Sequence, residues 1–415
     1  MNLSTIALAF LVSVSTATAT NAADVTLKVL YQANHPEIFK PLADAFTASQ
    51  NSITVELIPG DGNYEGIMQA LVRSRIANDV PDVSFLGFDF MRMTSETKVG
   101  APIDSFIEAD SDMAGAGYLK NMTDTCVHNK KRLGMPFAIS LPVVLYNQDL
   151  LQKAGVDTSS LTFTWDEIAE IAKKVDALDD DTRGIFYTYD ASGNWTLKAL
   201  IESAGGSMMN ADDTEITFDN EVGQWAFGVL NKIGNSGFFN VSRNQARQSF
   251  SAGKLGILVE SSSGLNNYIE NTKGFFDMRV GPFPVPSPAG RLPAGGNCVV
   301  MTTHDPARQA AAWEFIKFVT SAEGQTILAN NSGYVPNNNK ALEGNSEIAK
   351  RFTVDPDYKV VTDELRYAGP SYAFPGKNST RITRLIEEYM RRVLINEIEP
   401  SQALSQMRAE VEDLL

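Results

Sequence analysis

The sequence predicts an α/β protein of two lobes, because its length, its composition and its order of elements all favour that class. The chain has 415 residues, of which 43% are hydrophobic and 20% charged, a globular composition. At roughly 100–200 residues per domain, this length is sufficient for two or three domains with substantial cores. Strand patterns alternate with helix patterns along the chain. That alternation predicts a mainly parallel sheet with helices on both faces in each lobe.

The first elements have a β-α-β order. Residues 25–30 alternate as a strand, apolar residues recur at helical spacing over 39–46, and residues 53–57 alternate again. A polar loop then leads to a helix that includes residues 67–71. Residues 82–86 follow as a short buried strand.

The middle of the chain predicts a second system of the same kind. Thr164 and Glu167 have the spacing of a capping box, which predicts the start of a helix. Residues 255–259 form an apolar strand that ends in a polar turn at residues 260–264, and a helix pattern follows. Residues 281–290 are the most proline-rich stretch, which is typical of a linker or a crossover between lobes.

The C-terminal part is predicted to be helical. Apolar residues form one stripe over residues 382–394 and a second over residues 403–414, on either side of Pro400. Such stripes indicate two amphipathic helices that pack against a core.

The charge and the rare residue types exclude several function classes. Against 50 acidic residues stand 35 basic ones, a net charge of −15, and such a surface repels nucleic acids and anionic lipids. Two cysteines and three histidines are too few for multi-cysteine zinc or iron–sulfur sites. The acidic runs at 179–181 and 212–213 lack the alternating ligand spacing of a calcium loop. We therefore expect no metal, no cofactor and no nucleic-acid partner.

The N-terminus predicts export. Residues 1–23 contain no charged side chain, and a short apolar run over residues 6–14 is followed by small residues, as in a secretory signal peptide cut near Ala22 or Ala23. The mature protein is then expected in the periplasm. Export permits a disulfide between Cys126 and Cys298, but the sequence alone slightly favours the alternative of two buried thiols.

Signatures of catalysis are sparse. The segment 376–378 lacks the upstream glycine and the hydroxyl of a phosphate-binding loop, and no nucleophile elbow or paired histidines occur. One enzymatic alternative remains, a secreted glycoside-processing enzyme that uses a carboxylate pair such as Asp89 and Glu65.

Four groups of residues, in order along the chain, carry a family resemblance. Residues 135–157 begin with a proline–aromatic strand, reach Tyr-Asn and end near Lys-Ala-Gly, and residues 164–167 follow. Residues 295–297, 313–325 and 332–336 continue the pattern. Together they resemble the family 1 extracellular solute-binding proteins of ABC importers, nearest to the sugar and glycerol-phosphate binders.

The resemblance implies a two-lobed, type II periplasmic-binding-protein fold with three crossovers between the lobes. It places residues 24–139 and about 290–333 in lobe 1, and about 140–285 and 334–415 in lobe 2. It also implies a monomer that binds a small polyhydroxylated solute, a sugar, polyol or glycerol derivative, and delivers it to ABC permease subunits. A chemoreceptor-coupled sensor is the second alternative.

The resemblance also implies where the ligand lies, and the residue types suit a polyol because hydroxyls, backbone amides and flat aromatic rings contact its oxygens and carbon faces. The expected ligand-binding residues are Tyr64, Asp89, Ser140, Trp195, Ser262, Ser263, Gly296 and Tyr334. The segment 372–376 lacks the arginine that glycerol-phosphate binders place on the phosphate. Glycerol phosphate is therefore not predicted as the ligand unless Arg381 or Lys377 substitutes.

Overall fold

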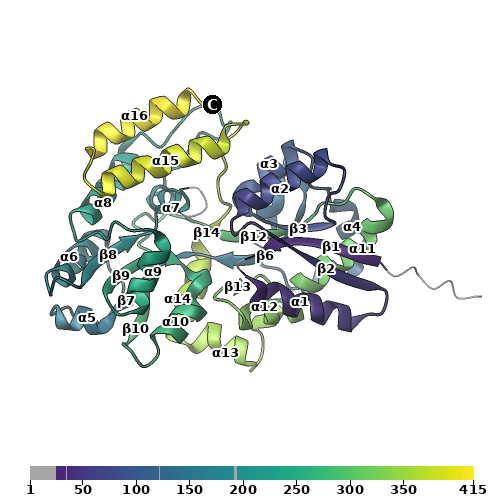
Figure 1. The fold of residues 1–415 in the computed structure, drawn as a ribbon, viewed down its shortest axis with the longest axis horizontal. Helices are drawn as coiled ribbons and strands as arrows, with labels where there is room; N and C mark the ends of the chain where they lie inside the picture. The colour runs from purple at the N-terminus through teal and green to yellow at the C-terminus, as the bar shows by residue number, and fades with distance from the viewer. Residues whose placement is uncertain (1–24, 34, 121, 191–193) are drawn as a thin grey trace, which may run out of the picture.

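The computed structural model shows an α/β fold with two main sheets (Figure 1). It describes residues 25–33, 35–120, 122–190 and 194–415. The predicted signal peptide, residues 1–23, lies outside the described residues. Within those residues, no helix combines the length and the apolar character that crossing a bilayer requires.

The first sheet has six strands in the order β13-β6-β12-β3-β1-β2. Alternate side chains enter two cores, one on each face, which explains the period-two pattern of the sequence. We call this sheet and its covering helices the first lobe. Its strands are β1 (Val25–Gln32), β2 (Ile53–Gly60), β3 (Val83–Gly87), β6 (Gly134–Ser140), β12 (Gly295–Met301) and β13 (Val335–Pro336), and its main helices are α1 (Pro36–Ser49), α2 (Tyr64–Ile76), α3 (Met91–Glu96), α4 (Asp104–Ala109), α11 (Pro306–Thr320) and α12 (Ala322–Asn330).

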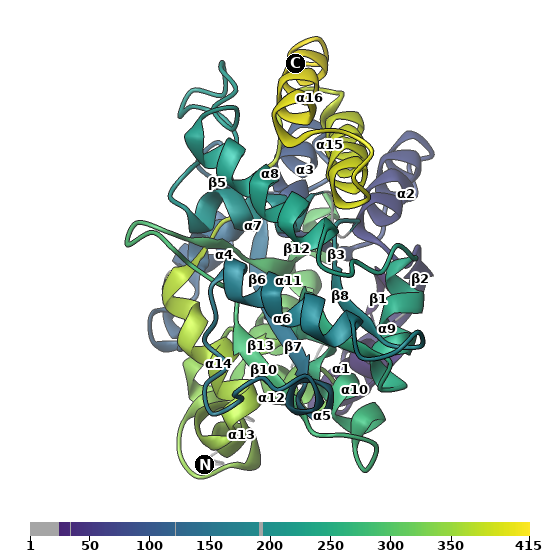
Figure 2. The same ribbon diagram turned by 90° about the vertical axis from the view of Figure 1, so that its left-hand side faces the viewer.

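The second sheet has four strands in the order β10-β7-β9-β8, and one continuous core surrounds it. We call it and its helices the second lobe, which faces the viewer in Figure 2. The strands are β7 (Pro142–Asn147), β8 (Arg183–Tyr187), β9 (Leu255–Ser261) and β10 (Met278–Pro282). The helices are α5 (Gln148–Lys153), α6 (Trp165–Asp176), α7 (Trp195–Ser203), α8 (Glu221–Gly234), α9 (Arg243–Ser251), α10 (Leu265–Thr272), α13 (Glu347–Val354), α14 (Pro356–Glu364), α15 (Ser379–Leu394) and α16 (Pro400–Glu412).

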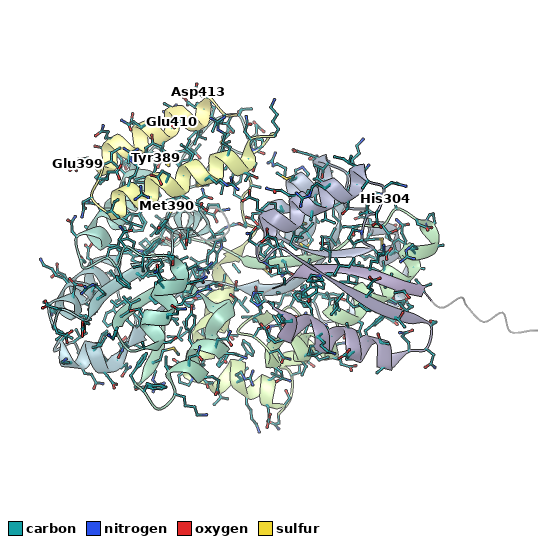
Figure 3. All side chains as sticks on the ribbon, in the orientation of Figure 1. His304, Tyr389, Met390, Glu399, Glu410 and Asp413 are labelled. Atoms are coloured by element: carbon teal, nitrogen blue, oxygen red, sulfur yellow. A yellow bond between two sulfur atoms is a disulfide. The ribbon has the colours of Figure 1, made fainter. Side chains whose placement is uncertain are left out.

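Two local sequence predictions are confirmed. Thr164 Oγ1 accepts from the Glu167 amide and the Glu167 carboxylate accepts from the Thr164 amide, so α6 begins with the expected capping box. The two C-terminal stripes are α15 and α16, which lie against each other at the top of Figure 3. There, the Tyr389 hydroxyl donates to Glu410 Oε1 at 2.7 Å.

Two passages of the chain between the sheets can be followed in the order of the strands. Only Leu141 separates β6 of the first sheet from β7 of the second. The chain returns between β10 and β12, through a short two-stranded ribbon of β11 (Leu292–Pro293) and β14 (Ala368–Gly369). Val335 pairs with Ile139 in the first sheet, so residues 335–336, expected at the start of lobe 2, belong to the first lobe.

The sheets are mixed, and the expectation of mainly parallel sheets is wrong. β1 pairs in parallel with β2 and β3, but β12 runs antiparallel to both β3 and β6. In the second sheet, β8 and β9 are parallel, whereas β7 is antiparallel to both β9 and β10. A strand that leaves a lobe and a strand that returns to it beside the first must run in opposite directions. The crossovers therefore impose the antiparallel pairs β6–β12 in the first sheet and β7–β10 in the second.

Cys126 and Cys298 form a disulfide, with their Cα atoms 5.9 Å apart. Cys126 ends a short 3-10 turn at Thr123–Cys126, and Cys298 lies in β12. The bridge therefore fastens the returning strand to a part of the same lobe that lies 172 residues earlier in the sequence.

Candidate functional site

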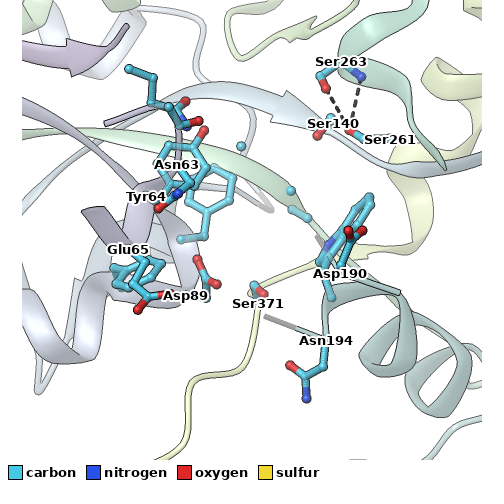
Figure 4. Close-up of a pocket in the computed structure, with 18 of the residues that line it drawn as sticks. Asn63, Tyr64, Glu65, Asp89, Ser140, Asp190, Asn194, Ser261, Ser263 and Ser371 are labelled. Atoms are coloured by element: carbon cyan, nitrogen blue, oxygen red, sulfur yellow. Dashed lines mark hydrogen bonds between the residues drawn. The ribbon is translucent and has the colours of Figure 1, made fainter. Parts of the chain in front are cut away.

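A cavity of about 760 Å³ lies between the lobes and is lined by residues of both. Figure 4 shows the first lobe contributing Asn63, Tyr64 and Asp89, while the second contributes Asp190, Ser261 and Ser263. A volume of this size accommodates a small organic solute.

The structure brings together seven of the eight predicted ligand-binding residues. Those that line the cavity are Tyr64, Asp89, Ser140, Trp195, Ser263, Gly296 and Tyr334. Ser262 does not line it. They come from segments that are far apart in the sequence, so their convergence depends on the crossovers.

The geometry of residues 261–263, which we call the serine turn, explains why Ser262 does not line the cavity. Ser261 and Ser263 line the cavity, and their hydroxyls lie 3.0 Å apart (Figure 4). Ser262 is buried, and its hydroxyl accepts from the Leu141 amide at 3.1 Å. The Ser262 side chain thus holds Leu141, where the chain first passes between the lobes. The serines that face the cavity are its two neighbours, Ser261 and Ser263. The Ser262 amide also donates to Leu141 O, so it is not free for a ligand.

Two tyrosines of the first lobe meet near the serine turn. Tyr64 begins α2, and its hydroxyl accepts from Asn297 Nδ2 at 2.9 Å. Burial raises the pKa of Tyr64 well above its ordinary value. Burial also raises the pKa of Tyr334, although the hydroxyls of Tyr64 and Ser263 oppose this shift. Both phenols therefore stay neutral near pH 7 and present hydroxyls and ring faces to the cavity.

Backbone without side chains forms the wall between Ser140 and Trp195. A Cβ on Gly295 would lie 2.7 Å from Ser140 Oγ and 3.1 Å from Trp195 Cζ2, so only glycine fits. Gly296 has φ +112°, and a Cβ there would come within 1.9 Å of Ala138 O. Trp195 Nε1 donates to Pro293 O at 2.8 Å, which fixes the indole ring against this wall.

Lys198 is a cavity residue that the sequence analysis missed. It follows Trp195 by one helical turn on α7 and is 2% exposed, and its ammonium donates to Ser371 Oγ at 3.3 Å and to Tyr372 O at 2.9 Å. The spacing of three residues from Trp195 was the available signal, because residues three apart share a helix face. Arg381 and Lys377, considered as substitutes for the missing arginine, do not line the cavity.

Asp89 faces the cavity from the first lobe. Burial raises the pKa of its carboxyl, while Lys198 opposes the shift. Burial lowers the pKa of Lys198, while Asp89, Glu202 and Glu387 oppose that shift. The two groups therefore influence each other across the cavity from opposite lobes.

Two further cationic side chains, those of Arg243 and Arg247 on α9, line the second-lobe wall. Both bind the buried Glu260, with Arg243 Nε at 2.8 Å and Arg247 Nε at 3.0 Å from Oε2. Burial alone would raise the pKa of Glu260, but the two arginines lower it to about 2. This cluster supports the strand end from which the serine turn starts.

Ion pairs join the lobes beside the cavity. Glu65 of α2 binds Arg384 of α15, and Arg92 of α3 binds Asp213 in the segment before α8. The Tyr372 hydroxyl also donates to Asp213 Oδ1, at 2.8 Å. The two ion pairs link the two walls independently of any ligand, and the Tyr372 hydrogen bond holds Asp213 in place.

Comparisons with known proteins point to one family. A family model described as bacterial extracellular solute-binding protein matches residues 41–359. The sn-glycerol-3-phosphate-binding periplasmic protein UgpB of Agrobacterium fabrum is 25% identical over 212 residues, 49% of this chain and 48% of that protein. The alignment thus spans about half the length of this curated relative. A binding protein of Brucella abortus is 22% identical over 96% of this chain and 95% of its own length.

Solved structures share the fold. An ABC substrate-binding protein from Listeria monocytogenes, in complex with cycloalternan, has a TM-score of 0.79 at 19% identity over 94% of this chain and 98% of its own. UgpB from Mycobacterium tuberculosis, in complex with glycerophosphocholine, has a TM-score of 0.79 at 18% identity over 93% and 97%. Maltose-bound MalE3 of T. maritima has a TM-score of 0.76 at 19% identity over 94% and 100%.

Proposed function

The chain belongs to the family of bacterial extracellular solute-binding proteins, and from that membership we propose that it binds a small polyhydroxylated solute for an ABC importer. The observation that carries the proposal is the cavity between the lobes, which is lined by hydroxyl-bearing side chains, by aromatic rings and by the glycines Gly295 and Gly296. Sugars and polyols present many hydroxyls and weakly apolar faces, which such walls contact. The solute is bound in the cavity, and hinge closure presents the closed form to the permease subunits.

We also propose that the chain is exported to the periplasm, acts as a monomer and catalyses no reaction. The charge-free N-terminal segment supports export. The enzymatic alternative needed Glu65 as the second carboxylate, but Glu65 is bound to Arg384 and is therefore poorly placed to act as a free base or nucleophile. In this proposal the third crossover follows β13, and lobe 1 includes the residues up to about Asn338.

A thermal-shift screen of the mature chain tests the proposal. The panel contains maltose, trehalose, glycerol, glycerol 3-phosphate and glycerophosphocholine. A ligand that binds only the folded state adds about 2.7 kcal/mol of stability at 100 times its Kd, so a true ligand raises the melting temperature in a concentration-dependent way. If no sugar or polyol shifts the melting temperature at millimolar concentration, the proposed solute class is wrong.

Tyrosine variants then test the site. We expect Tyr64→Phe and Tyr334→Phe to weaken binding of the hit about three- to tenfold, because each removes one hydroxyl from the cavity wall. Tyr118→Phe is the matched control, since its hydroxyl lies 3.0 Å from Thr320 Oγ1 and the residue does not line the cavity. Unchanged affinity in both cavity variants would contradict the proposed site.

A further inference from the structure

The cations that line the cavity divide into paired and unpaired groups. All four lining arginines are bound to carboxylates: Arg92 to Asp213, Arg243 and Arg247 to Glu260, and Arg384 to Glu65. Lys198 has only neutral acceptors, Ser371 Oγ and Tyr372 O, and no carboxylate of a described residue is within ion-pair distance of it. An ammonium has three N–H donors, so one remains for a ligand.

The opposite wall holds the complementary group. Asp89 lies on the short 3-10 turn Phe88–Phe90 that follows β3, and no side chain of another described residue hydrogen-bonds its carboxylate. In Figure 4, Asp89 and Ser371 both point into the space between the lobes. A charged donor from one lobe and a charged acceptor from the other therefore face the same space without contacting each other.

From this juxtaposition we infer that Lys198 is a ligand-contacting residue that, with Asp89, clamps two neighbouring hydroxyls of an uncharged solute. The ammonium donates to one hydroxyl oxygen, and the carboxylate accepts from the other hydroxyl. The inference rests on the proposed function and narrows its substrate class to solutes with vicinal hydroxyls and no phosphate.

The surroundings of Lys198 disfavour an anionic ligand. Asp89, Glu202 and Glu387 are neighbouring acids whose charged forms raise the pKa of Lys198, although burial raises the pKa of Glu202 and of Glu387 to about 7. A phosphate dianion placed beside the ammonium would also approach these carboxylates. Since all four lining arginines are already bound to carboxylates of Asp or Glu side chains, none is free to offset that repulsion. A neutral diol uses both unpaired charges and adds none.

The clamp also explains how binding couples to closure. Lys198 belongs to α7 of the second lobe and Asp89 to the first, so one pair of adjacent hydroxyls touches both lobes at once. A solute that lacks either hydroxyl contacts only one of the two charges and stabilises the closed arrangement less.

Calorimetric titration of the mature chain with maltose, trehalose, glycerol 3-phosphate and glycerophosphocholine tests the inference. We expect a sugar to bind and Lys198→Met to weaken it about 10- to 100-fold, as expected for loss of a hydrogen bond from a charged group. Asp89→Asn should weaken it similarly, and Lys198→Arg less. Lys254→Met is the control, because Lys254 is exposed and outside the cavity.

The outcomes separate the inference from the proposed function. If no sugar binds the wild type and no polyol shifts its melting temperature, the proposed solute class and the clamp both fail. If a sugar binds and neither Lys198→Met nor Asp89→Asn weakens it, only the clamp fails. Tighter binding of a phosphate-bearing probe than of any sugar, lost in Lys198→Met, would instead identify Lys198 as an anion site and overturn the inference. If Lys198→Met does not fold, Asp89→Asn still tests the clamp, because it changes the partner group on the other lobe.

Discussion

Glu260 is fully buried, yet it lies among two arginines, the Ser261 amide and the Thr188 hydroxyl. Because a carboxylate so well bound is more stable ionised than protonated, its pKa in the folded protein falls to about 2. The unfolded chain has a pKa of about 4.3 for Glu. The stabilisation is therefore complete above about pH 5 and is lost as the pH falls toward 2.

Glu260→Gln should remove this pH dependence. We expect a loss of about 1–3 kcal/mol in the free energy of unfolding at pH 7, discounted because the arginines are partly exposed, and a smaller loss at pH 3. Urea unfolding of both proteins at the two pH values measures the difference. Glu343→Gln, an exposed carboxylate, is the control. An equal loss at both pH values would show that Glu260 does not titrate as argued.

The serine turn separates structural from binding roles. Ser262→Ala should lower the free energy of unfolding by about 1–3 kcal/mol, because it leaves the buried Leu141 amide without its side-chain acceptor. Its effect on ligand affinity should be small. Ser263→Ala should show the reverse, with weaker binding and little loss of stability. Chemical unfolding and calorimetry of the two variants distinguish the roles, and equal profiles would contradict the assignment.

These residues also show how far the sequence determines the site. Tyr64, Ser140 and Tyr334, which the resemblance singled out from recognisable local motifs, line the cavity, and so does Asp89, which stands at a departure from the family pattern. It did not determine which serines of residues 261–263 face inward, since that depends on the register at the end of β9. Lys198 was missed because its burial results from packing between α7 and the C-terminal segment.

At the scale of elements, local sequence patterns predicted where helices and strands form, but they did not predict whether neighbouring strands run parallel or antiparallel. The capping box predicted the start of α6, alternation located β1 and β2, and a continuous apolar run located β9. The directions of the strands that leave or enter a lobe follow from the path of the chain between the lobes. Periodicity carries no information on that path, so the mixed sheets were not predicted.

The disulfide is a link between elements, and its removal should be costly. Cys126 and Cys298 join the turn after α4 to β12, and closing so long a segment restricts the unfolded chain strongly. We expect Cys126→Ser/Cys298→Ser to lower the free energy of unfolding by about 2–5 kcal/mol. Urea unfolding with and without reductant measures this.

The double variant provides its own control, because reductant should destabilise the wild type and leave the variant unchanged. Hydrogen exchange should locate the loss in β12 and its neighbours rather than in the second lobe. Equal stability of the oxidised wild type and the variant would show that the bridge contributes nothing.

For the whole molecule, the family resemblance is confirmed, and its central consequence is that the two lobes are interleaved in sequence. The four strands of the second sheet lie between β6 and β12, so the first sheet is completed only after the second sheet has been synthesised, and the second lobe gains α13 to α16 later still. The net charge of −15 suits such a carrier, because a surface of that sign repels anionic lipid headgroups.

The ion pairs that join the lobes beside the cavity bear on the balance between open and closed forms. Glu65–Arg384 and Arg92–Asp213 are partly exposed, with side chains between 21% and 66% accessible, so each contributes on the order of 0.2–1 kcal/mol. Both are broken when the lobes separate. They therefore favour the closed arrangement before any solute binds. Less of the binding free energy of a solute is then needed to close the lobes.

Arg92→Met/Arg384→Met should therefore open the unliganded protein and weaken solute binding by a few-fold to about tenfold. Small-angle X-ray scattering should show a larger radius of gyration for the unliganded variant, while the liganded forms stay alike. Because exposed pairs are screened, 0.5 M salt should weaken binding to the wild type more than to the variant. Arg408→Met, which breaks pairs to Asp219 and Glu412 within the second lobe, is the control. If the double variant keeps the wild-type radius and affinity, the lobes are held by packing and solute alone, since neither ion pair then affects closure.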